Sequence, residues 1–262
     1  MKKRGALLWQ ISGDSSPHSS YIFGTMHVKD PRAFGRREAV YEKIAQCHLF
    51  CTEIALDTLP SFLATTFLLP AGQGIDHLLS EKKYTKLKRI LLKSFGLNLD
   101  QLKSFKPIVI ANMIDEQMLQ NEMPEALDRH LWNYAQRLGK TCIGVEELSE
   151  QIELLGKVPL DQQMKGLQSV GRNVSSQRRR IRSLTRAYEQ GDIYRIYQMA
   201  RRGSGKIRHS MIFNRNQHMA NRLTEMMQRQ TLFFAVGAGH LAGDKGVIRL
   251  LKKRGFRLHP VA

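Results

Sequence analysis

The hydrophobic pattern of the first 55 residues predicts three strands and one helix. Short apolar runs bounded by turn residues are typical of strands, and they occupy residues 7–11, 21–25 and 48–54. A polar segment that contains glycine and proline separates the first two runs, so they are expected to form a hairpin or to lie as neighbours. Apolar positions within residues 31–46 recur at helical spacing. This strand–helix–strand order predicts a βαβ crossover.

Farther along the chain the spacing of apolar residues becomes helical. Residues 59–138 and 150–230 follow this spacing, with interruptions at glycine and proline. Strands return as short apolar runs at residues 141–145, 232–236 and 256–261, and a helix at about 245–254 precedes the last of them. The 262 residues, 42% of them hydrophobic, suffice for one sizeable core. We therefore predict one α/β domain over residues 1–262, with a central mixed sheet built from both chain ends, flanking helices and a large helical insertion.

Four predicted inner strands are each followed by a side chain that can bind a metal or transfer a proton. These side chains are His27, Glu53, Glu146 and His240. In open α/β sheets ligands bind outside the carboxyl ends of the strands, so we expect the four side chains to converge. Both histidines come three residues after a glycine, which permits a sharp exit from the strand and close backbone approach. The repeated Gly-x-x-His motif is the stronger part of this pattern.

Such a set of imidazole and carboxylate groups is suited to divalent metal ions. Zn²⁺, Mn²⁺, Co²⁺ and Fe²⁺ all accept these ligands, and the ligand types alone do not choose among them. A bound metal would polarise a carbonyl group and lower the pKa of water, and one carboxylate would remain as general base. The sequence therefore predicts a metal-dependent hydrolase.

Charge is distributed unevenly along the chain. There are 41 Lys and Arg residues against 23 Asp and Glu, a formal net charge of +18, and residues 165–215 hold thirteen basic residues and only two acids. A basic face of this kind can attract an anionic partner, although it is more often a solvated helix surface. Because the segment matches no nucleic-acid-binding motif, we do not expect nucleic acid to be the partner.

The cysteines and the N-terminal residues bear on the cellular compartment. Cys47, Cys51 and Cys142 are an odd number without the spacing of a disulfide framework, which indicates a reducing compartment. The apolar run at residues 6–9 is too short for a signal peptide, and no segment approaches the length of a membrane span. We expect a soluble protein, cytoplasmic as the sequence stands and extracytoplasmic if a leader has been removed.

These residues, in this order, resemble the TraB/GumN family, which includes the Tiki proteins. The resemblance runs nearly end to end, and its specific part is the two Gly-x-x-His motifs together with Arg215 and Asn216. It implies an α/β fold related to the erythromycin-esterase-like proteins. For Tiki members it implies a metal-dependent protease, often with Mn²⁺ or Co²⁺. Carried over by position, the metal ligands would be His27, Glu53, Glu146 and His240.

The resemblance also implies roles in catalysis. Glu53 or Glu146 would act directly in the reaction, and Arg215 and Asn216 would orient the substrate or stabilise an oxyanion. Glu147 follows Glu146 directly and could compete for its role. We therefore expect a peptidase that acts on a peptide or protein. The alternative is a non-catalytic module of the pheromone-shutdown type that binds a peptide or an anionic partner.

Overall fold

The chain forms two compact units. A computed structural model describes residues 5–13, 18–57, 67–118, 122–203 and 209–261. Unit 1 consists of Met1–Thr58, Asn121–Leu154 and Leu184–Ala262, and unit 2 consists of Leu59–Gln120 and Leu155–Ser183. The sheet belongs to unit 1, and unit 2 is helical. The assignment of residues 1–262 to one domain stays a prediction.

Unit 1 is built on a six-stranded mixed sheet with the strand order β4-β3-β5-β2-β1-β6. Its strands are β1 (Leu8–Ser12), β2 (Ser20–Thr25), β3 (Leu49–Thr52), β4 (Thr141–Gly144), β5 (Leu232–Gly237) and β6 (Arg257–Pro260). Strand β1 pairs antiparallel with β2 and β6, whereas β5 pairs in parallel with β2 and β3, and β3 with β4. The predicted α/β class, with a mixed sheet built from both chain ends, is confirmed, and so is the hairpin.

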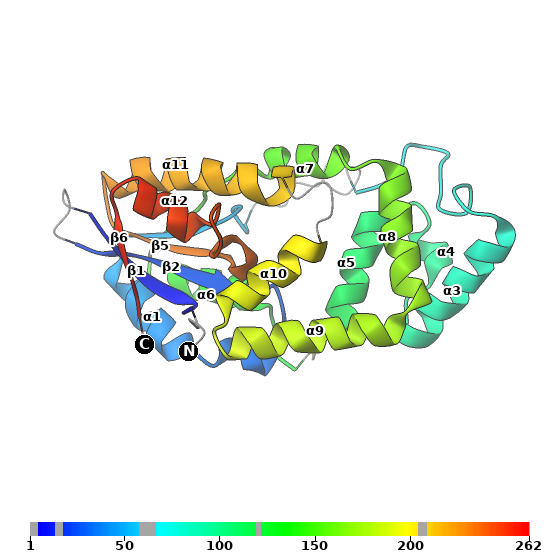
Figure 1. The fold of residues 1–262 in the computed structure, drawn as a ribbon, viewed down its shortest axis with the longest axis horizontal. Coiled ribbons are helices and arrows are strands. Elements are labelled where there is room, and N and C mark those ends of the chain that lie inside the picture. The colour runs from blue at the N-terminus through cyan, green and yellow to red at the C-terminus, as the bar shows by residue number, and fades with distance from the viewer. Residues whose placement is uncertain (1–4, 14–17, 58–66, 119–121, 204–208, 262) are drawn as a thin grey trace. The chain divides into compact units, whose positions relative to one another are not determined.

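Helices cover both faces of this sheet. Figure 1 shows α11 (Arg215–Met227) and α12 (Val247–Lys253) over one face and α1 (Arg37–Gln46) and α6 (Leu127–Arg137) over the other. Strand β2 is buried along its whole length, and β5 is buried except at its last residue. Continuous apolar runs are typical of strands covered on both faces, which explains why these two segments could be recognised as strands from the sequence.

Further helical elements connect the strands and helices of unit 1. They are η1 (Pro31–Phe34), α7 (Leu148–Gly156), α10 (Ile193–Gly203), η3 (His209–Asn214) and η4 (Ala238–His240). The single helix predicted over residues 31–46 is divided into η1 and α1, so that prediction was partly wrong. The Asp30 carboxylate accepts a hydrogen bond from the backbone N–H of Arg32 at 3.0 Å, which caps a separate short turn before Gly35.

Unit 2 contains α3 (Glu81–Phe95), α4 (Leu99–Leu102), α5 (Pro107–Gln117), α8 (Leu160–Arg172) and the first part of α9 (Val174–Glu189). Helix α3 buries Leu87, Leu91 and Phe95, which are four residues apart and therefore share one face. It ends at Gly96, whose φ of 68° is the left-handed conformation that glycine adopts easily. The helical reading of this region is confirmed for the described helices, and residues 58–66 lie outside the described part.

Gly144, the last residue of β4, is packed too closely for any side chain. A Cβ atom at this position would lie 2.5 Å from the backbone nitrogen of Ala55 and 3.0 Å from the carbonyl oxygen of Glu146. Backbone atoms cannot rotate away, so Gly144→Ala should lower the free energy of unfolding by about 1–3 kcal/mol. Urea unfolding followed by circular dichroism measures this change.

Gly166 offers a matched control for that substitution. It lies inside α8, and a Cβ atom there would meet nothing within 4 Å. Gly166→Ala should therefore raise stability, by up to about 1 kcal/mol, because alanine is the better helix former. Equal stability of the two variants would contradict the packing argument at Gly144.

Candidate functional site

Four parallel strands end at the same edge of the sheet. In the register of the sheet, Thr25 of β2 lies opposite Gly237 of β5, and Thr52 of β3 lies opposite Gly144 of β4. Directly beyond these ends the chain continues into His27, Glu53, Glu146 and His240. The backbone therefore delivers all four segments to one edge, and helix α11 supplies further side chains there.

Arg215, the first residue of α11, holds two of the four side chains together. It is 9% exposed, and its Nη2 donates to Oε2 of Glu146 at 2.6 Å and also to Oε2 of Glu53. Its Nε lies 3.1 Å from both carboxylate oxygens of Glu146. Burial by itself would lower the pKa of Arg215, but the hydrogen bonds and charges of the two carboxylates outweigh it and raise the pKa. One cation is thus bound between two carboxylates, of which Glu146 is buried and Glu53 is partly exposed.

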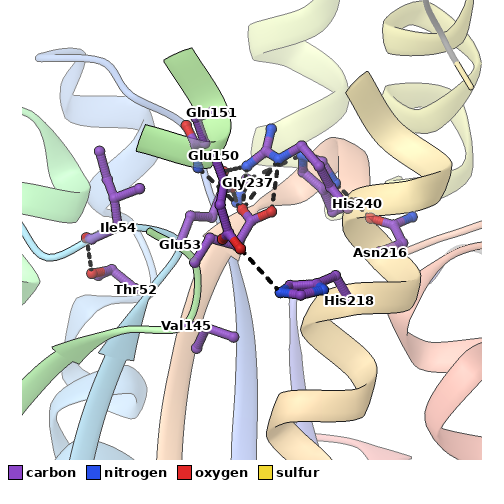
Figure 2. Close-up of polar contacts among 12 residues, drawn as sticks. Thr52, Glu53, Ile54, Val145, Glu150, Gln151, Asn216, His218, Gly237 and His240 are labelled. Atoms are coloured by element: carbon purple, nitrogen blue, oxygen red, sulfur yellow. Dashed lines mark hydrogen bonds and ion pairs between the residues drawn. The ribbon is translucent and has the colours of Figure 1, made fainter. Parts of the chain in front are cut away.

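Glu53 is held on both of its oxygens. Oε1 accepts a hydrogen bond from the backbone N–H of Gly237 at 2.8 Å, and Nε2 of His240 lies 4.0 Å from the same oxygen (Figure 2). Burial by itself would raise the pKa of Glu53, but the imidazole of His240, the guanidinium of Arg215 and the N–H of Gly237 lower it to about 2. A carboxylate with so low a pKa is a weak general base near neutral pH. Glu53 is better suited to carry charge or bind a cation.

His240 is oriented through its Nδ1 atom. Nδ1 lies 2.6 Å from Oδ1 of Asn216 (Figure 2). Nδ2 of Asn216 donates to the carbonyl oxygen of Lys245 at 2.6 Å. Because the carbonyl of Lys245 can only accept, the amide NH₂ of Asn216 faces it and the amide oxygen faces His240. Nδ1 therefore carries the proton, and the lone pair of neutral His240 is on Nε2.

Burial also decides the charge of this histidine. Asn216 is completely buried beside His240. Burial lowers the pKa of His240 below its usual 6.5, and the opposing charge of Glu53 does not reverse the direction. At neutral pH His240 is therefore uncharged. Its Nε2 is directed toward the carboxylate cluster, which is formed by Glu53, Glu146 and Arg215.

His27, in the other Gly-x-x-His motif, has a similar partner. Its Nδ1 lies 2.8 Å from Oδ2 of Asp128, a residue of the first turn of α6. The carboxylate of Asp128 accepts, so the neutral imidazole keeps its proton on Nδ1 and its lone pair on Nε2. The side chain of His27 is 66% exposed. Asp128 was not predicted from the sequence to have a role.

A second layer of side chains fixes the segment around Glu146. The backbone N–H of Glu146 donates to the carbonyl of Glu53 at 2.7 Å, and Nε2 of Gln151 donates to Oε2 of Glu146 at 3.1 Å. Arg222 donates to the carbonyl oxygen of Val145 at 2.5 Å and to Glu150 at 3.2 Å. Arg222 was missed from the sequence, yet it follows Arg215 by seven residues and so lies on the same face of α11.

The competition between Glu146 and Glu147 is decided by burial. Glu146 is 5% exposed and contacts Arg215, whereas Glu147 is exposed to solvent. Glu146 is therefore the carboxylate of this pair that belongs to the cluster.

The histidines and the carboxylates of this site differ in how their side chains are engaged. The parts of the chain that the structure describes contain no group of three or more His, Cys, Asp or Glu side chains placed to hold a metal ion. Glu53 and Glu146 both direct oxygens at Arg215. In contrast, His27 and His240 each have Nδ1 bound to an oxygen acceptor, as is usual for metal-binding histidines.

The cysteines take no part in this cluster. Cys47 and Cys51 are buried and all three thiols are free, and burial raises the pKa of Cys47 to about 12 and that of Cys142 to about 11. Thiols with such high pKa values are inert as nucleophiles.

The shifted pKa values predict how stability depends on pH. The pKa of Glu53 falls from 4.5 to about 2 on folding. Its ionised carboxylate therefore contributes fully to the free energy of unfolding above about pH 4.5, and this contribution is lost as the pH falls toward 2. The pKa of His240 falls below 6.5, so the unfolded chain binds this proton first and stability declines as the pH drops below 6.5.

Urea unfolding between about pH 7 and pH 3 measures both effects. We expect Glu53→Gln to make the loss of stability below pH 4.5 shallower, because this residue then no longer titrates. A loss as steep as that of the wild type would show that Glu53 does not have the low pKa.

The fold and the cluster define a class of α/β protein with polar side chains at the carboxyl ends of parallel strands. The model of the TraB/PrgY/gumN family matches residues 7–260, and the chain belongs to this family. No solved structure matches the chain. Among the described residues, no helix has the length and apolar character that crossing a membrane requires.

Similar curated proteins are named as metalloproteases. Metalloprotease TIKI1 of Danio rerio is 25% identical over 313 aligned residues, which cover 97% of this chain and 62% of that protein. Metalloprotease TIKI2 of Danio rerio is 24% identical over 98% of this chain and 61% of its own length. Metalloprotease TIKI1 of Homo sapiens is 23% identical, with coverages of 97% and 61%. The chain thus spans about six-tenths of the length of these relatives.

Proposed function

We propose that this protein is a metal-dependent hydrolase that cleaves a peptide or protein at the strand-end cluster of unit 1. The observation that carries the proposal is that the two Gly-x-x-His histidines each have Nδ1 bound to an oxygen acceptor, as metal-binding histidines do. The names of the similar proteins support both a metal and a proteolytic activity.

His27 and His240 would hold the metal, and Glu53 or Glu146 would complete the set of ligands. Mn²⁺, Co²⁺ and Zn²⁺ all suit these groups. When bound, such an ion polarises a carbonyl group and lowers the pKa of water. Glu53, whose low pKa keeps its carboxylate ionised at neutral pH, is a candidate ligand, and Glu146 would be a further ligand or the general base.

Arg215 and Asn216 would act through other side chains rather than on the substrate. Arg215 is buried and its guanidinium is engaged by Glu53 and Glu146, so it would position these carboxylates and balance their charge. Asn216 is completely buried and fixes the tautomer of His240. These contacts favour positioning roles over the oxyanion contact expected from the family resemblance.

Metal analysis and a peptide digest test the proposal together. Protein purified without added metal should retain about one divalent transition-metal ion per chain. It should cleave members of a peptide library, a chelator should stop the cleavage, and restored metal should recover it. Saturable peptide binding that is unaffected by chelator, without turnover, would instead identify a non-catalytic binding module.

A further inference from the structure

Helix α3 of unit 2 carries four cations on one face. Lys82, Lys86, Arg89 and Lys93 are all exposed, and they follow one another at intervals of four, three and four residues. At 100° per residue, these positions lie opposite the buried face formed by Leu87, Leu91 and Phe95. The four residues, named here the α3 cation stripe, extend along about 16 Å of helix.

Among the described residues of unit 2, no ion pair neutralises the charge of the stripe. The described aspartates of this unit each pair with a different cation, in Asp76–Lys103, Asp100–Lys88, Asp115–Arg180 and Asp161–Lys165. None of these cations belongs to the α3 cation stripe, which has no ion pair among the described residues. Unit 2 has fifteen Lys and Arg against six Asp and Glu, so its net charge of +9 is half of the +18 of the whole chain.

Two neighbouring side chains extend this surface. Leu92, at the flank of the stripe, is an exposed large apolar residue with 53% of its surface accessible. Arg178 of α9 donates from Nη2 to the carbonyl oxygen of Ser94 at 3.2 Å, which places another exposed cation at the C-terminal end of α3. The surface therefore combines a line of positive charge with one apolar side chain.

We propose that the α3 cation stripe docks unit 2 on an anionic lipid surface. Clusters of four to eight Lys and Arg on an amphipathic helix are typical of binding to anionic headgroups, whose lateral mobility lets them match any spacing of cations. Leu92 can enter the headgroup region beside the stripe.

The composition of α3 argues against nucleic acid as the partner. Three of the four cations are lysines, whereas arginine is preferred for bidentate contacts with phosphates and bases. The aromatic side chains of α3 are not free to stack on bases, because Phe95 is buried and Tyr84 donates to Asp100 and packs against the core.

Vesicle co-sedimentation of the full chain tests the proposal. The probes are phosphatidylcholine vesicles with and without about 30% phosphatidylserine. Wild-type protein should bind only the anionic vesicles, and binding should weaken as salt rises. Replacing all four residues of the stripe with glutamine should lower the partition coefficient at least about 100-fold, since each cation near the surface contributes about fivefold.

A matched control separates the stripe from total charge. Glutamine at Arg137, Arg229, Arg249 and Lys253, four exposed cations of unit 1, removes the same charge from the protein. This control variant should bind like the wild type. Equal binding by the stripe variant, an equal loss in the control, or equal binding to neutral vesicles would each overturn the proposal.

The last measurement of the test compares binding to nucleic acid with binding to anionic vesicles. Tighter binding to a duplex or single-stranded oligonucleotide than to anionic vesicles, abolished in the stripe variant, would also overturn the lipid assignment. Circular dichroism of each variant verifies that its helices are retained. No arm requires hydrolysis, so the outcome does not depend on the proposed enzymatic activity.

Discussion

Arg215→Ala is expected to lower the free energy of unfolding by about 3–5 kcal/mol at neutral pH. The substitution leaves Glu53 and Glu146 as two carboxylates beside each other without the guanidinium that both contact. Uncompensated buried charges are costly because they have lost water and gained no partner. Urea unfolding followed by circular dichroism measures the difference from the wild type.

Two further variants show whether the cost comes from charge. Adding Glu146→Gln to Arg215→Ala removes one of the two anions and should recover part of the lost stability. Arg222→Ala, on the same helix, removes an arginine that is 33% exposed and pairs with the 40% exposed Glu150, so it should cost only about 1 kcal/mol. A loss below 1 kcal/mol for Arg215→Ala would show that this ion-pair cluster does not stabilise the fold.

His27→Ala and His240→Ala are each expected to lower metal affinity and peptide hydrolysis at least about 100-fold, and the double variant should abolish both. In the proposed function the Nε2 atoms of both histidines bind the metal, while the Nδ1 atoms stay bound to their oxygen acceptors. Metal analysis of purified protein and initial rates on a cleaved peptide give the two readouts.

Variants of the histidine partners refine the same experiment. Asp128→Asn and Asn216→Ala should lower metal affinity about 10- to 100-fold, as is usual for residues that orient metal-binding histidines. His218→Ala is the matched control, because His218 is 47% exposed and contacts Glu150 rather than the carboxylate cluster (Figure 2). Full metal retention in the double histidine variant would exclude the proposed site.

The sequence by itself predicted the fold class and most elements of unit 1. Buried strands such as β2 and β5 are short, continuous apolar runs between turn residues, so local pattern is enough to find them. The position of a ligand-type residue after each parallel strand was equally visible. What these features share is that neighbouring residues along the chain determine them.

Only the tertiary structure decided how the side chains at the strand ends are partnered. Arg215 lies 69 residues from Glu146 and 162 from Glu53, and no local pattern indicates that one guanidinium contacts both. The same holds for Asp128, which is 101 residues from its partner His27. The sequence also did not show which positive charges remain without an ion pair. Residues 165–215 are richest in basic residues, yet the α3 cation stripe lies outside that range. Apolar periodicity acts over a few residues, whereas ion pairs and hydrogen bonds depend on distances in space that only packing of the whole chain sets.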